Sequence, residues 1–158
     1  MAESGDKLSE RLPPPDEAGS RPSTLGVQAG KDCWLVDMAD VSEILPPPAL
    51  TSVPLTRPWY CGVANIRGNL YSISDLAAFQ GQAVTPREGQ SRVLLVNPKF
   101  ACNAGLLVTR VLGLRDTAKW RRDDTADGEC YCDEQGQAWR KLDIAGLLQQ
   151  AEFLRIGT

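Results

Sequence analysis

The chain has 158 residues, of which 42% are hydrophobic and 23% are charged, a length that suits one globular domain or two small subdomains around a shared core. Its 17 basic and 20 acidic residues give a net charge of -3, so it lacks the strong basic field that attracts nucleic acids or anionic membranes. Histidine is absent, which removes the usual general base and the commonest metal ligand. The chain therefore relays no phosphate through histidine.

The cysteines and the N-terminus indicate a cytoplasmic protein. An odd number of cysteines at irregular spacing is typical of reduced thiols rather than of a secreted disulfide framework. The N-terminus has no cationic start followed by an apolar run, and no stretch approaches the ~20 apolar residues that span a bilayer. The five cysteines are Cys33, Cys61, Cys102, Cys130 and Cys132.

Residues 1–24 form the first predicted segment. They combine Ser, Asp, Glu and Arg with the run Pro13-Pro14-Pro15 and contain almost no bulky apolar residues. Such a composition buries too little surface to offset chain entropy, so we predict a disordered tail, with a folded domain over residues 25–158. A proline-rich docking ligand is the alternative interpretation of the same run.

From Leu25 onward, short apolar runs alternate with Gly, Pro, Asn and Asp at roughly 8- to 12-residue intervals, which is typical of small antiparallel barrels. A turn of helix is predicted over Ala39–Leu45 and a short helix over Asp75–Phe79. The predicted strands are Cys33–Met38, Gly62–Ile66, Leu70–Ser74, Arg92–Val96, Phe100–Val108 and Arg110–Arg115.

Three local patterns refine this outline. The triplet Arg67-Gly68-Asn69 predicts a tight turn between two strands, since Gly and Asn tolerate a positive φ. The run Val93–Val96 is apolar on both faces and predicts a fully buried strand. Near the C-terminus, Leu142, Ala145 and Leu148 form an apolar stripe at helical spacing, with Asp143 in the first turn where it favours the helix dipole.

Four ordered segments carry a family resemblance. Trp34–Leu45 contains the pattern V-x-E-I, and Gly62–Leu76 follows the pattern G-V-x-N-L-R-G with Asp and Leu at its end. The third and fourth segments are Arg92–Val96 and Gly105–Leu112. In these segments the chain resembles the CheW-like chemotaxis coupling (adaptor) protein family, and its departures from the family pattern favour the PilI type found in twitching-motility systems.

The resemblance implies both a fold and a function. The fold would be mainly β, with two small SH3-like five-stranded β-barrel subdomains packed around a shared core, and a C-terminal helix. The protein would be a non-enzymatic adaptor without a cofactor, linking a methyl-accepting chemoreceptor to a CheA-type histidine kinase. The receptor contributes its cytoplasmic helical tip, which would lie in a groove, and the kinase contributes its regulatory domain.

The resemblance also implies site residues. A bare glycine Cα lets a partner backbone approach closely, and Arg67 would be a polar anchor at the rim of the groove. Receptor binding is assigned to Val41, Gly62, Val63, Arg67 and Gly68, and kinase binding to Leu70 and Ile73.

Several of these residues also have purely structural interpretations. Arg67 would pin a carboxylate such as Asp75, or a turn carbonyl, within its own domain. Asp75 is favoured as the cap of a helix start over a catalytic acid, because no second carboxylate or histidine accompanies it. Thr109 stands where the family commonly has Asp.

Two other functions stay open at this point. Cys130-Tyr131-Cys132, with Cys102 or Asp133, would form a metal site, although a single Cys-X-Cys pair lacks the four ligands of structural zinc. Small barrels also bind oligonucleotides on basic, aromatic faces. Here the aromatic residues are scattered, and Arg121-Arg122 is followed at once by Asp123-Asp124.

Overall fold

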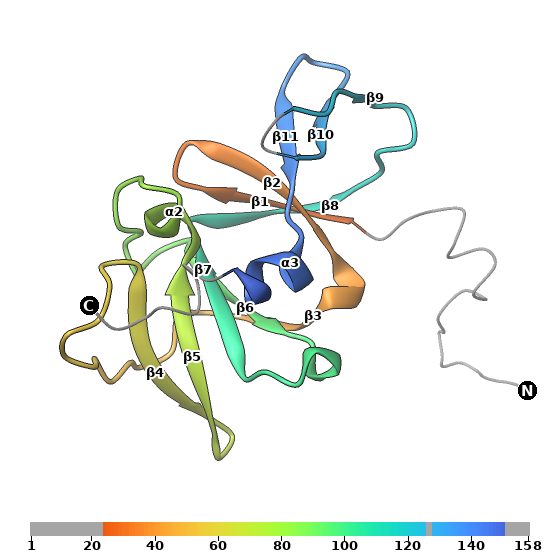
Figure 1. The fold of residues 1–158 in the computed structure, drawn as a ribbon. Helices are drawn as coiled ribbons and strands as arrows, with labels where there is room; N and C mark the ends of the chain where they lie inside the picture. The colour runs from red at the N-terminus through yellow and green to blue at the C-terminus, as the bar shows by residue number, and fades with distance from the viewer. Residues whose placement is uncertain (1–23, 126–127, 151–158) are drawn as a thin grey trace, which may run out of the picture.

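A computed structural model describes residues 24–125 and 128–150, which form two β-sheets joined by short helices (Figure 1). The mainly β fold predicted above is confirmed. In chain order the elements are β1 (Thr24–Ala29), β2 (Asp32–Asp37), the 3₁₀ helix η1 (Met38–Asp40), β3 (Val41–Leu45), β4 (Tyr60–Ile66), β5 (Asn69–Asp75), α2 (Leu76–Phe79), β6 (Arg92–Val96), the 3₁₀ helix η2 (Pro98–Phe100), β7 (Ala104–Val108), β8 (Arg110–Arg115), β9 (Arg121–Arg122), β10 (Cys130–Cys132), β11 (Ala138–Lys141) and α3 (Ile144–Gln149).

The first sheet has six strands, one more than the five predicted, in the order β8-β1-β2-β11-β10-β9. Its strands pair antiparallel except for β11 beside β2. The sheet begins at Thr24, one residue before the predicted start of the domain. Thr24 is only 6% exposed and pairs with both Asp37 and Arg115. A deletion that removes residue 24 would therefore cut into the sheet.

The second sheet has five strands in the order β3-β6-β7-β5-β4, with β5 and β7 parallel. Strand β6, which lies between β3 and β7, is buried on both faces, as predicted, with Val93, Leu94 and Leu95 each 1% exposed. Alternate residues of a strand face opposite sides of a sheet. The residues of β6 therefore contribute to two separate apolar clusters.

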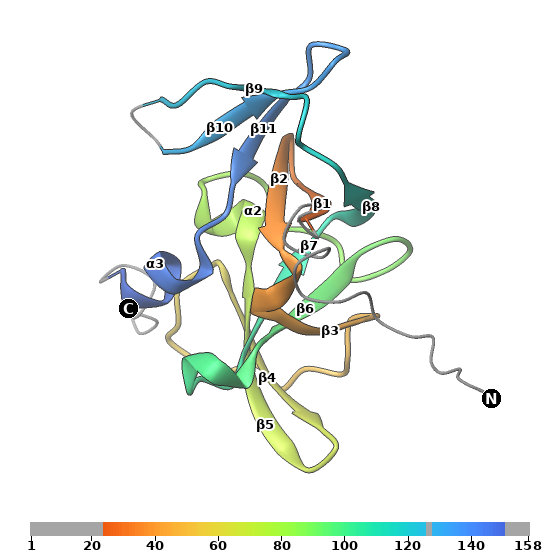
Figure 2. The ribbon, with the colours of Figure 1, turned by 90° about the vertical axis from the view of Figure 1, so that its right-hand side faces the viewer.

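The larger cluster is a core that both sheets share. It contains Val27 and Trp34 of the first sheet, Leu94 and Leu106 of the second, and Ile144 of α3. Figure 2 shows the two sheets one above the other, with α3 beside their junction. The smaller cluster belongs to the second sheet alone. Since each sheet buries one face in the same cluster, the predicted shared core is confirmed.

Most predicted strands match the structure, and two of them, Arg92–Val96 and Arg110–Arg115, match to the residue. The helical turn over Ala39–Leu45 is wrong beyond Asp40, because Val41–Leu45 pairs with β6 as β3. The strand predicted from Phe100 begins only at Ala104, since Pro98–Phe100 forms a 3₁₀ turn capped by Asn97.

Both short α-helices begin at an aspartate. Asp75 Oδ1 accepts a hydrogen bond from Ala78 N, and Asp143 Oδ1 accepts one from Gly146 N. These N-caps satisfy helix N–H groups that have no partner inside the helix. The interpretation of Asp75 as a helix cap is therefore confirmed. Neither helix in the part of the chain that the structure describes is long and apolar enough to cross a bilayer.

Asp75 also holds the segment that follows α2. Its side chain has 0% exposure and accepts hydrogen bonds from Thr85 N at 2.6 Å and Thr85 Oγ1 at 2.8 Å. Replacing Asp75 with alanine leaves three donors unpaired, two of them in a buried place. We expect Asp75→Ala to lower the free energy of unfolding by about 3 kcal/mol, measured by urea denaturation.

The matched control is Asp143→Ala, which removes an exposed N-cap without a second buried contact. We expect that variant to lose only about 1 kcal/mol. Equal losses in the two variants would contradict the buried role of Asp75.

Candidate functional site

The predicted receptor residues lie on the two edge strands of the second sheet and on the turn that follows one of them. Val41 begins β3, Gly62 and Val63 lie on β4, and Arg67 and Gly68 form the turn between β4 and β5. In the strand order, β3 and β4 are at opposite ends of the sheet. The sheet must therefore curl for these residues to come together.

Two contacts bring the edges together. The segment after β3 returns to β4 at Thr51, where Thr51 N donates to Val63 O at 2.8 Å and Val63 N donates to Thr51 O at 2.9 Å. Farther along, the guanidinium of Arg67 forms a two-point ion pair with the Glu43 carboxylate of β3. The second sheet is thus closed on itself around its own apolar cluster, as a small barrel is.

The Arg67–Glu43 pair lies on the surface, with the two side chains 65% and 39% exposed. The hydrogen bond to Glu43 raises the pKa of the Arg67 guanidinium further, so Arg67 is always cationic. The alternative pairing of Arg67 with Asp75 is wrong, because Asp75 is fully buried and bonded to Thr85. Arg67 does pair within its own domain, but its partner is Glu43.

Gly62 is in close contact with its own chain rather than open to a partner. Its φ is +127°, and a Cβ there would lie 2.4 Å from Thr51 O. The missing side chain therefore admits the Thr51 segment that closes the barrel. Gly68 differs, since its φ is +86° but a Cβ there would meet no atom within 4 Å.

The remaining predicted residues differ in how much surface they offer. Val41 is 7% exposed and packs in the shared core, whereas Val63 is half-buried. Leu70, near the tip of the β4–β5 hairpin, is 62% exposed. Ile73 has 0% exposure and packs in the inner cluster of the second sheet, so its side chain supports the hairpin from inside.

Two polar residues that sequence analysis did not connect to the fold have clear structural partners. Thr109 Oγ1 accepts a hydrogen bond from Gly30 N at 2.9 Å, so the hydroxyl supplies an acceptor where an aspartate is common. Asp37 accepts from Ala39 N and caps η1. The Thr109 contact joins residues 79 positions apart, so local sequence does not reveal it, whereas the Asp37 cap is a local contact to the residue two positions on.

Cys61 lies beside Gly62 but is a poor nucleophile. Burial, with a smaller contribution from the nearby Asp75 carboxylate, raises the pKa of its thiol to about 11 against the opposing effect of Arg87. The thiolate is the reactive form of cysteine. Cys61 therefore stays a neutral thiol at physiological pH.

The structure gives little support to the two rival sites. Across residues 24–125 and 128–150, no three His, Cys, Asp or Glu side chains gather as a metal site would require. Cys130 and Cys132 are the first and last residues of β10, with Tyr131 between them. At the rival nucleic-acid site, Arg122 is paired with Asp124 at 2.9 Å and with Glu129 at 3.6 Å, so much of its charge is already neutralised.

The described residues define a β module whose distinctive polar residues lie on closed strand edges and an exposed hairpin. A model of the CheW-like domain family matches residues 23–152, and the chain belongs to that family. This family of scaffold and adaptor domains is not a class of enzymes, which agrees with the predicted adaptor class.

Individual proteins agree with the family assignment. The chain is 37% identical over 109 residues to Protein PilI of Pseudomonas aeruginosa, an alignment that covers 69% of this chain and 61% of that relative. It therefore spans about three-fifths of the length of the curated relative it matches. The crystal structure of the scaffolding protein TtCheW from Thermoanaerobacter tengcongensis superposes with a TM-score of 0.69 at 16% identity, covering 83% of this chain and 94% of that one. The predicted likeness to CheW-like and PilI-type proteins is confirmed.

The environment of Gly62 predicts a structural defect when it is substituted. Gly62→Ala places a methyl group against the Thr51 carbonyl and forces a side chain into a positive-φ conformation. We expect a loss of about 2 to 4 kcal/mol in the free energy of unfolding, measured by chemical denaturation.

Gly68→Ala is the matched control, because it has the positive φ without the clash. It should lose only about 1 kcal/mol. If Gly62→Ala were no less stable than Gly68→Ala, the close approach of Thr51 would not constrain Gly62.

Proposed function

We propose that this protein is a cytoplasmic adaptor that couples a methyl-accepting chemoreceptor to a CheA-type histidine kinase in type IV pilus twitching motility. Membership of the CheW-like family supports the adaptor role, and the likeness to Protein PilI supports the twitching branch. The observation that carries the proposal is the exposed Arg67–Glu43 pair, which positions a cation on the surface where the barrel closes.

Arg67 is suited to anchor the receptor tip. A guanidinium has five N–H donors, and Glu43 takes two of its nitrogens in a fork that fixes its orientation. The remaining donors of the 65% exposed side chain are available for a carbonyl or carboxylate of a partner helix. The ion pair therefore orders the side chain before binding, which reduces the entropy lost on contact.

The other receptor residues would contribute in different ways. Val63 offers a half-buried apolar surface on β4, and Gly68 keeps the turn beside Arg67 free of side-chain bulk. Val41 and Gly62 are buried and would act by shaping the backbone beneath that surface. The receptor surface then consists of Val63 and the Arg67-Gly68 turn, supported by Val41 and Gly62.

The kinase surface would be centred on Leu70. Its side chain is 62% exposed, and an apolar side chain so exposed at a hairpin tip is a natural contact for a partner's apolar surface. Ile73 would keep the hairpin rigid from inside. With receptor and kinase held on neighbouring parts of one rigid sheet, a shift of the receptor tip biases kinase activity through fixed geometry.

The receptor contact predicts that Arg67→Ala binds a chemoreceptor-tip fragment roughly 10- to 100-fold more weakly, because charged hydrogen bonds are lost. Thermal stability should change little, since the ion pair is exposed. Arg121→Ala, which removes a similarly exposed arginine from β9, is the control and should bind normally. Isothermal titration calorimetry measures all three proteins, and full affinity in folded Arg67→Ala would sink this assignment.

The kinase contact predicts that Leu70→Ala weakens binding to the kinase regulatory domain about tenfold, while Leu114→Ala, a 65% exposed leucine on β8, does not. Ile73→Val should instead cost about 1 kcal/mol of stability and leave the affinity nearly unchanged. Surface plasmon resonance and urea denaturation give the two quantities. Identical affinities for Leu70→Ala and Leu114→Ala would remove Leu70 from the interface.

A further inference from the structure

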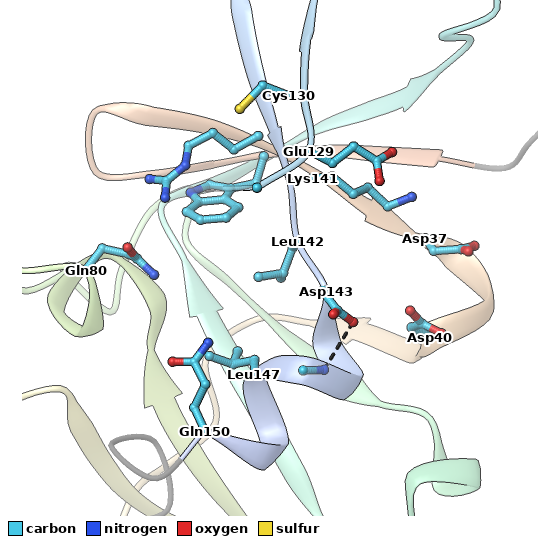
Figure 3. A pocket seen from close by; sticks show the side chains of 14 residues that line it. Asp37, Asp40, Gln80, Glu129, Cys130, Lys141, Leu142, Asp143, Leu147 and Gln150 are labelled. Carbon is cyan, nitrogen blue, oxygen red and sulfur yellow. Dashed lines mark hydrogen bonds between the residues drawn. The ribbon is translucent and has the colours of Figure 1, made fainter. Parts of the chain in front are cut away.

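A hollow of about 740 Å³ lies at the junction of the two subdomains, away from the residues assigned to receptor and kinase. Its walls come from β2, β10, β11 and α3, and Gln80 at the end of α2 lies on its rim. Figure 3 shows Leu142 and Leu147 within it, with Gln80 and Gln150 on one side and Asp37, Asp40 and Asp143 on the other. We call it the junction hollow.

Carboxylates outnumber cations in the junction hollow. Asp37, Asp40, Glu129 and Asp143 line it, against Arg140 and Lys141, so its lining carries an excess of two negative charges. Two of the carboxylates are already paired, Asp40 with a lysine at 2.9 Å and Glu129 with an arginine at 3.6 Å. A cationic ligand would therefore interact mainly with the other two.

Asp37 and Asp143 have no cation within ion-pair distance among the residues that the structure describes. Each uses Oδ1 to cap a helix, which fixes the side chain and leaves Oδ2 without a hydrogen-bond donor among the described residues. Two fixed carboxylates on one side of a hollow favour a cationic group.

An unpaired donor gives a second, independent indication of a ligand. Trp34 lines the junction hollow and is only 5% exposed, yet its indole Nε1–H has no acceptor in the described part of the chain. Buried donors are normally satisfied, so such a group marks a place where an acceptor is expected. The guanidinium of Arg140 stacks over the ring at 4.3 Å and is 29% exposed, so it is the neighbour that can move to admit one.

From these observations we infer that the junction hollow docks a basic segment of a partner protein. A lysine or arginine of that segment lies against Asp37 and Asp143, its aliphatic stem packs on Leu142 and Leu147, and a main-chain carbonyl accepts the Trp34 N–H. A peptide is the ligand class that supplies a cation, an apolar stem and a carbonyl acceptor together. The site uses none of the residues proposed for receptor or kinase binding.

The probe is a blocked hexapeptide with two arginines among alanines, compared with the same peptide carrying glutamines. It is titrated into the full, isotope-labelled chain while the indole N–H signals of the four tryptophans are followed by NMR. Trp34→Phe identifies the Trp34 signal. We expect the arginine peptide, and not the glutamine peptide, to shift the Trp34 indole and the Lys141 and Gly146 amides.

Charge variants then locate the cation. Asparagine caps helices as well as aspartate does, so Asp37→Asn with Asp143→Asn removes charge and keeps the caps. This double variant should bind the arginine peptide at least about tenfold more weakly. Asp116→Asn with Glu134→Gln makes the same change of charge at exposed positions outside the hollow and should bind within about twofold of the parent.

Three results would overturn the inference. One is the absence of any Trp34 indole shift up to about 5 mM arginine peptide. Another is an equal loss of affinity for the arginine peptide in both double variants, which would mean that the peptide is attracted only by the net charge of the protein. The third is full affinity in Trp34→Phe, which would remove the hydrogen bond that distinguishes this site from a charged surface.

Discussion

The burial of β6 and β7 on both faces is the constraint on which the rest of the structure depends. Leu94 and Leu106 face the core shared by the two sheets, whereas Val93 and Leu107 face the inner cluster of the second sheet. Gly105 of β7 faces the inner cluster, where a Cβ would be 2.9 Å from Val93 Cγ1. These two strands therefore form a wall between two apolar clusters, and loss of the first sheet would expose the side that faces the shared core.

This arrangement leaves the strand edges and hairpins to carry function. The core takes up the middle strands, so partner contacts are available only where a strand ends, turns or lies at an edge. The closing contacts of the second sheet, Thr51 on Val63 and Arg67 on Glu43, hold such surface groups in fixed positions without enlarging the core. An adaptor that acts by geometry requires surfaces of this kind, because a flexible surface would not transmit the position of one partner to another.

Sequence reasoning succeeded where a signal is local. The doubly apolar run Val93–Val96 and the predicted tight turn between two strands each reflect a few adjacent residues, and both are confirmed, although the positive φ falls on Arg67 and Gly68 while Asn69 already begins β5. The prediction of a helical turn was wrong for Val41–Leu45, because the apolar positions there fit helical and strand spacing equally well. Pairing with β6 makes this segment a strand. The three short strands β9, β10 and β11 were missed because each has only two to four residues and mostly polar neighbours. The partners of Arg67 and Gly62 lie 24 and 11 residues away, and only tertiary closure reveals them.

A polar network connects the junction hollow to both subdomains. Gln82, which follows α2, accepts a hydrogen bond at 2.7 Å from N of Lys31 in the turn between β1 and β2 and donates one at 2.9 Å to Asp32, the first residue of β2. Asp32 in turn pairs with Arg140 of β11 at 3.2 Å, and Arg140 covers Trp34. A ligand that moves Arg140 to reach the indole N–H must also disturb its bond to Asp32, and Asp32 is held by Gln82 of the second subdomain. Binding in the junction hollow is thereby coupled, through three side chains, to the contact between the subdomains.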